Sequence, residues 1–233
     1  ALPAGVPADP AALAEVSPAI ARGAVRQLAF VIDVPGWAYE NIVDHIAPRL
    51  AGRYEVTRFF IADHPDRVDL LGKLFVENRF GNIHFMWREL WFNTLSNPGM
   101  LFRLGQQHGL GADQLAERIA APTVTTTIYD HLFLEPDEVD ARRMALALTD
   151  GYATASDRLA GIHADAHGRA PDAITPDGVD TGFFTPAPAR PTGNALRVGW
   201  VGNSGWGKGK AGMGDDPKGL HSILEPAIAL LRA

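Results

Sequence analysis

The sequence predicts an α/β fold built on a doubly wound parallel sheet. The first observation is an almost continuously apolar run at Leu28–Val34, which ends at Pro35-Gly36 and suits a strand buried on both faces. The second is a helical pattern in residues 42–50, followed by a strand-like segment at Tyr54–Ile61. Together they form a strand–helix–strand unit. Further strands and helices alternate after it, which is typical of parallel sheets.

This alternation continues as far as Pro176. The acidic first turn of the helix that begins at Asp137 suits the helix dipole, and Ser156 is a natural N-cap for the next helix. Further strands are expected at 82–87, 124–129, 152–155 and 173–176, and further helices at 111–121, 137–148 and from 156 onward.

A change of composition after this sheet indicates the end of a domain. Residues 184–194 contain three prolines, which is typical of a linker. A new strand is then expected at Leu196–Val201, followed by a glycine-rich loop and one helix. Because one strand and one helix cannot close a core, the predicted organisation is a first domain, a linker and the beginning of a second domain, at 1–188, 189–195 and 196–233.

Composition and charge exclude several classes of protein. The 27 acidic and 21 basic residues give a net charge of -6, which argues against a nucleic-acid-binding protein. Without cysteine, the chain can form no disulfide, zinc–thiolate site or cysteine nucleophile. No apolar stretch is long enough to span a membrane, and Ala1–Pro18 lacks the basic region of a signal peptide. These features favour a cytoplasmic location.

Two glycine motifs raise the question of phosphate binding. Residues Gly202–Lys208 match the spacing G-x-x-x-x-G-K of a P-loop, but Gly209 stands where a hydroxyl residue would hold Mg²⁺. The turn after the first strand lacks the dinucleotide pattern G-x-G-x-x-G, so no nicotinamide cofactor is expected. Its single glycine, Gly36, permits close approach of the backbone to a ligand. The alternative is that Gly36 serves only a tight strand-to-helix turn.

Several side chains follow the ends of predicted strands and are candidates for a site. His131 could contact a sugar hydroxyl or transfer a proton, and Trp87 with Arg88 could offer a stacking face and a cation. For each of them the alternative is a structural role. The eight histidines show no metal-binding spacing, and no metal site is expected.

Two segments resemble glycosyltransferases of the GT-B fold, family-4 type. Ile174–Pro186 (ITPDGVDTGFFTP) is similar to the P-N-G-V-D…F-x-P segment that precedes the interdomain linker of that family. Val198–Ser204 (VGWVGNS) and Lys218–Leu231 (KGLHSILEPAIALL) are similar to the V-G-R…K-G…L…A…L opening of its second domain. Tyr152–Asp157 also resembles the strand-to-helix step just upstream in the family.

The resemblance implies two Rossmann-like domains that face each other across a cleft. The first would hold the acceptor and the second the nucleotide-sugar donor. Lys218 matches a lysine that stabilises charge on the departing diphosphate. Asn203 stands where the family has an arginine, so Lys208 or Lys210 would have to supply that charge, or donor binding differs. The site residues implied in this way are His131 as the catalytic residue, Gly36, Trp37, Asn203, Ser204 and Lys218 for the donor, and Trp87, Arg88 and Tyr129 for the acceptor.

The activity implied is transfer of a sugar from a nucleotide-diphosphate donor to a glycan or lipid-linked acceptor in bacterial surface polysaccharide synthesis. Transfer would proceed with retention and without a metal or other cofactor. The family's Glu-x₇-Glu segment, which holds the donor sugar, would lie beyond Ala233. We therefore expect residues 1–233 alone to have little or no transferase activity.

Two other functions remain open, and so does membrane contact. One alternative is a P-loop phosphotransferase that uses Gly202–Lys208, and the other is a non-enzymatic carbohydrate-binding module. Enzymes of the family often make peripheral contact with the inner membrane through exposed apolar residues. The candidates for such contact are interpreted here as core residues; they are Phe85, Trp91, Phe92, Met100 and Phe102.

Overall fold

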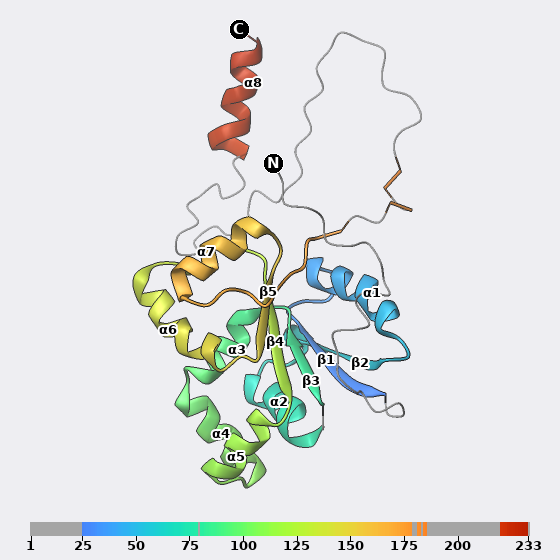
Figure 1. Cartoon of the computed structure of the whole chain (residues 1–233), viewed down its shortest axis with the longest axis vertical. Helices are drawn as coiled ribbons and strands as arrows, with labels where there is room; N and C mark the ends of the chain where they lie inside the picture. The colour runs from blue at the N-terminus through green and yellow to red at the C-terminus, as the bar shows by residue number, and fades with distance from the viewer. Residues whose placement is uncertain (1–24, 79, 179–180, 183, 186–219, 233) are drawn as a thin grey trace. The chain divides into compact units, whose positions relative to one another are not determined.

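The protein is described by a computed structural model, whose fold is shown in Figure 1. The structure describes residues 25–78, 80–178, 181–182, 184–185 and 220–232. The chain divides into two compact units. One comprises Ala1–Ile128 with Ala145–Tyr152, and the other comprises Tyr129–Met144 with Ala153–Ala233.

Six parallel strands form the sheet, which confirms the predicted α/β class with a Rossmann-like arrangement. Their order in the sheet is β2-β1-β3-β4-β5-β6. The register of β1 against β3 pairs Leu28 with Asn82 and Val31 with Phe85. The strands are β1 (Arg26–Ile32), β2 (Tyr54–Phe60), β3 (Asn82–Phe85), β4 (Thr123–Ile128), β5 (Gly151–Thr154) and β6 (Ala173–Ile174).

The strand order reverses direction at β1. The chain passes from β1 to β2 on one side and then returns across β1 to β3 on the other. Because such crossovers are right-handed, α1 and the next crossover segment lie on opposite faces of the sheet. Figure 1 shows α1 and α3 on opposite sides of the strands. The helical segments are α1 (Ala38–Leu50), η2 (Ile61–Asp63), α2 (Arg67–Gly72), η3 (Lys73–Glu77), α3 (Arg88–Leu95), α4 (Pro98–His108), α5 (Ala112–Ala120), α6 (Pro136–Ala147), α7 (Asp157–His167), η4 (Leu220–Leu224) and α8 (Glu225–Arg232).

The main core of the first unit lies between the strands and helices α2, α3 and α4. Trp91 of α3 stacks against Phe75 and Phe85, with ring centroids 5.5 and 5.4 Å apart. Its indole Nε1 donates a hydrogen bond of 3.1 Å to Oγ1 of Thr149. Burial of these large rings supplies much of the hydrophobic stabilisation of this unit.

Five helical segments in this unit were not predicted from the sequence, namely η2, α2, η3, α3 and α4. Segment α2–η3 is apolar around most of its circumference, since Val68, Leu70, Leu71 and Leu74 are all buried. A helix that is buried on several sides shows no amphipathic stripe, so periodicity does not reveal it. Helix α4 has clear end signals instead, with Asn97 as its N-cap and Gly109 at φ 63° as its C-cap.

The second unit contains α7, whose first residue agrees with the sequence prediction. The Oγ of Ser156 accepts a hydrogen bond of 3.3 Å from the amide of Leu159, as expected of an N-cap. The helix ends at Gly168, which has φ 71°. The predicted linker and the strand at Leu196–Val201 lie outside the described residues, while η4 and α8 occupy part of the predicted C-terminal helix.

The burial of the side chains tests whether the five candidates for membrane contact are core residues. Phe85, Trp91 and Phe92 are at most 2% exposed, which confirms the core interpretation for them. Met100 is half-buried, whereas 64% of Phe102 is exposed, so for Phe102 that interpretation is wrong. Among the described helices, none combines the length and apolar character that a bilayer span needs.

Candidate functional site

The reversal of strand order between β1 and β3 lies wholly within the first unit. In open parallel sheets, ligands bind outside the carboxyl ends of the strands at such a switch point. The two strands end side by side, because the amide of Met86 donates a hydrogen bond of 2.9 Å to the carbonyl of Val31. The loops that follow β1 and β3 therefore begin next to each other and form the candidate site.

The turn from β1 to α1 depends on a glycine. Gly36 has φ +75°, in the left-handed region, although no heavy atom lies within 4 Å of the position of an added Cβ. The need for glycine is therefore one of backbone conformation and not of space. The amide of Gly36 donates a hydrogen bond to the carboxylate of Glu40. Trp37 is the N-cap residue of α1, and 52% of its surface is exposed.

The loop after β3 presents one exposed aromatic side chain. Trp87, which precedes α3, is 39% exposed, although the sequence placed it within the strand. Arg88 is 5% exposed, and its Nε lies 3.3 Å from Oε1 of Glu89, which is equally buried. The Arg88 charge is therefore matched inside the protein, and of the predicted pair only Trp87 is offered at the surface.

Asp33 is a site residue that sequence reasoning missed. It follows β1 directly, is half-buried, and its carbonyl accepts a hydrogen bond of 3.0 Å from Ala62. Its Oδ1 is buried without a hydrogen-bond partner in the described part of the chain. A buried acceptor without a partner costs about 1–3 kcal/mol, so a ligand or a water is expected to complete it. In the sequence, the signal that could have identified Asp33 was a single carboxylate near the end of an apolar run.

Tyr129 and His131 belong to the second unit, in the loop between β4 and α6. His131 is exposed and Tyr129 is half-buried. The side chain of Asp130 accepts a hydrogen bond of 3.0 Å from the amide of Leu132. The carbonyl of Asp130 lies 2.9 Å from Nε2 of His163, which is 1% exposed on α7. The backbone on either side of His131 is thus held in place by α7 and by a local turn.

The same loop contains a strained residue. Phe133 has φ 62°, the left-handed region, which costs a bulky side chain about 1 kcal/mol or more. The guanidinium carbon of Arg142, on α6, lies 4.3 Å from the centroid of its ring, a cation–π contact that favours this conformation. Backbone strain of this kind is concentrated at functional sites, which supports the choice of this loop as a candidate.

His163 is expected to be important for the stability of this loop. Its ring also stacks on that of His167 at 5.5 Å, and both rings are buried. We expect His163→Leu to lower the free energy of unfolding by about 1–3 kcal/mol, since the carbonyl of Asp130 loses its partner. Urea unfolding measures the change. The control His131→Asn, at an exposed position, should stay within about 0.5 kcal/mol. A loss no larger for His163→Leu than for the control would contradict the role assigned to this hydrogen bond.

Other predicted donor residues lie outside the described part of the chain. These are Asn203, Ser204 and Lys218, together with the glycine motif Gly202–Lys208. Their roles stay predictions.

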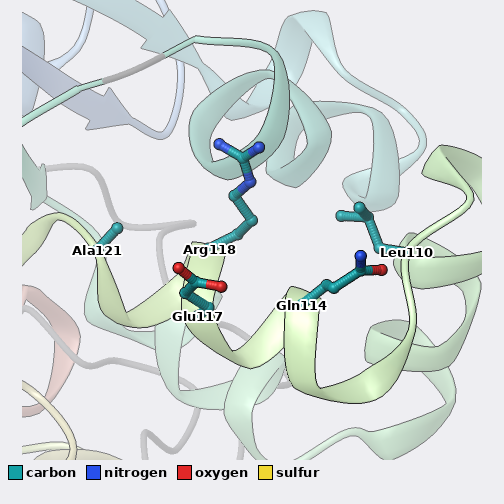
Figure 2. A pocket seen from close by; sticks show the side chains of 5 residues that line it. All are labelled: Leu110, Gln114, Glu117, Arg118 and Ala121. Carbon is teal, nitrogen blue, oxygen red and sulfur yellow. The ribbon is translucent and has the colours of Figure 1, made fainter.

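A hollow of about 360 Å³ lies beside α5, and Figure 2 shows the side chains that line it. Ala121 in its wall lies two residues before β4, so the hollow lies toward the amino ends of the strands. Ligands of parallel sheets bind at the opposite edge, and this hollow is therefore a weaker candidate. Its lining residues are Leu110, Gln114, Glu117, Arg118 and Ala121.

Within the ranges that the structure describes, no three His, Asp or Glu side chains are grouped so that they could hold a metal ion. Comparison with models of known families, with curated proteins and with solved structures gives no match for this chain.

Proposed function

We propose that the chain is the acceptor-side part of a GT-B glycosyltransferase, which transfers a sugar from a nucleotide-diphosphate donor to a glycan or lipid-linked acceptor. The observation that carries the proposal is the switch point between β1 and β3, where Trp37 and Trp87 are both exposed. Indole rings offer flat apolar faces with a polar edge, which suits the C–H faces and hydroxyls of a sugar ring. The motif resemblance around residues 174–231 supports the same function.

The roles of the residues follow from their chemistry. An acceptor hydroxyl attacks the anomeric carbon of the donor sugar while the nucleoside diphosphate departs. Lys218 would stabilise the negative charge that grows on the diphosphate, and the exposed His131 would exchange a proton with the acceptor hydroxyl or a phosphate oxygen. The amide of Gly36 is engaged by Glu40, so this turn would offer close backbone approach and not an N–H donor for phosphate.

Sugar binding by the whole chain tests the proposal. We expect wild-type protein to bind oligosaccharides on an immobilised glycan array. Trp87→Ala should weaken that binding by about tenfold or more, because it removes a stacking face. Phe102→Ala is the control, since it removes an exposed aromatic ring from α4, away from the switch point. Equal binding by wild type and Trp87→Ala would contradict the proposal.

The two alternative functions give different results in the same preparation. A carbohydrate-binding module would bind the glycans and show no affinity for nucleotide sugars. A P-loop phosphotransferase would hydrolyse nucleoside triphosphates with Mg²⁺, and Lys208→Ala would abolish that hydrolysis. Titration of UDP-sugars and GDP-sugars in a calorimeter separates these alternatives from the transferase.

A further inference from the structure

We propose that Asp33, Trp37 and Trp87 form a subsite for a neutral pyranose ring at the β1–β3 switch point, in which the Asp33 carboxylate accepts hydrogen bonds from sugar hydroxyls. Identification of this sugar as the transferase acceptor rests on the proposed function; binding of the sugar itself does not. Asp33 is thereby assigned as a specificity residue, and Trp37 is assigned to the acceptor instead of the donor.

The sheet sets the strand ends that precede these residues side by side. The paired register ends at Val31 and Phe85, and Asp33 and Trp87 each follow two residues later, after the ends of these neighbouring strands. The hydrogen bond from the amide of Met86 to the carbonyl of Val31 closes this last pair. The backbone of Asp33 is also held from the other side, by the 3.0 Å hydrogen bond from Ala62. The backbone that carries this carboxylate is therefore anchored by the end of β1 and by the segment after β2.

The Asp33 carboxylate has an unfilled hydrogen-bonding capacity within the described part of the chain. Asp33 forms no ion pair with any described residue, and its Oδ1 is buried without a hydrogen-bond partner. Buried acceptors in folded proteins are nearly always paired, so we expect a ligand or a water to donate a hydrogen bond to this oxygen. Sugar hydroxyls are such donors, and a hydrogen bond to a charged acceptor is one of the stronger kinds.

Two carboxylates flank the β1–α1 turn. Asp33 lies at its start and Glu40 in the first turn of α1, and the Glu40 carboxylate already accepts a hydrogen bond from the amide of Gly36. A diphosphate placed here would meet two like charges and no available amide at that glycine. A neutral ring with hydroxyl donors meets no such repulsion. The turn therefore suits an acceptor sugar, in contrast to the donor role that the family resemblance implied for Gly36 and Trp37.

Asp33→Asn tests the subsite, because it removes the charge and keeps the size of the side chain. We expect binding of neutral oligosaccharides on the glycan array to fall by about tenfold or more, while urea unfolding shows unchanged or increased stability. Binding of UDP, measured by calorimetry, should stay as in wild type. Asp63→Asn is the matched control, since Asp63 is an exposed acid after the neighbouring strand β2; it should change neither binding nor stability.

The outcomes separate the subsite from the transferase. Unchanged glycan binding by Asp33→Asn overturns the subsite, and loss of stability without loss of binding does so too, because it indicates a carboxylate satisfied by water alone. If Asp33→Asn weakens glycan binding but a longer protein containing this chain transfers no sugar, the subsite stands and the proposed function fails. If such a protein transfers sugar and Asp33→Asn leaves glycan binding intact, the proposed function stands and the subsite fails.

Discussion

Replacing Trp91 by alanine is expected to lower the free energy of unfolding by about 3–5 kcal/mol, the largest effect we predict. The side chain is 2% exposed and fills the space between Phe75 and Phe85. The substitution leaves a cavity that the neighbouring strands and helices cannot close, and it deprives Thr149 of a donor. A domain has only about 5–15 kcal/mol of stability, so the variant should be largely unfolded in mild urea. Urea unfolding followed by far-ultraviolet circular dichroism measures the change.

Two further variants separate the causes of this effect. Trp91→Phe keeps an aromatic ring in the stack but loses the indole N–H, and we expect a smaller loss of about 1–3 kcal/mol. Phe102→Ala removes a ring that is 64% exposed, and we expect it to change stability by at most about 0.5 kcal/mol. A loss below about 1 kcal/mol for Trp91→Ala would mean that the stacked rings do not organise the core.

The second large effect is a loss of stability in acid that depends on His84. Burial lowers the pKa of this histidine to about 4, whereas the pKa in an unfolded chain is about 6.5. Its Nδ1 lies 2.9 Å from Oγ1 of Thr125 and its Nε2 lies 3.2 Å from Oγ1 of Thr127. The rings of His84 and Phe30 pack edge to face, with their centroids 5.5 Å apart. The ring is thus accommodated in its neutral form.

The direction of the pH effect follows from the two pKa values. Between pH 6.5 and 4 the unfolded chain binds a proton at this residue and the folded chain does not, so stability falls as the pH falls through this window. From pH 7.5 to 5 the loss is at most about 2 kcal/mol, an upper limit because part of the ring surface is exposed. Above pH 6.5 the residue has little effect on the pH dependence.

Urea unfolding at pH 7.5 and pH 5 measures this contribution. We expect His84→Asn to lose less stability than wild type between the two values, because asparagine does not titrate. The control is His131→Asn, which removes an exposed histidine and should leave the wild-type difference unchanged. An identical acid sensitivity of wild type and His84→Asn would show that other groups cause it.

The sequence predicted part of the candidate site. Gly36 and Trp87 were identified because they follow predicted strands, whereas Trp37 was implied only by the family resemblance. Asp33 was missed since it lies at the end of such a run and its importance depends on what surrounds its carboxylate. The loop geometry around His131 could not be foreseen either, because the left-handed conformation of Phe133 depends on Arg142, nine residues further along the chain.

The sequence by itself determined the class of the fold and most of its strands. Apolar runs such as Leu28–Val34 and the N-cap at Ser156 are local patterns, and local patterns depend only on residues close in the chain. Only the tertiary structure decided the order β2-β1-β3, which sets the ends of β1 and β3, the strands that precede Asp33 and Trp87, side by side. Strand order depends on pairing between distant segments, and the burial of Arg88 or the orphaned oxygen of Asp33 depends on that pairing. No window of neighbouring residues contains this information.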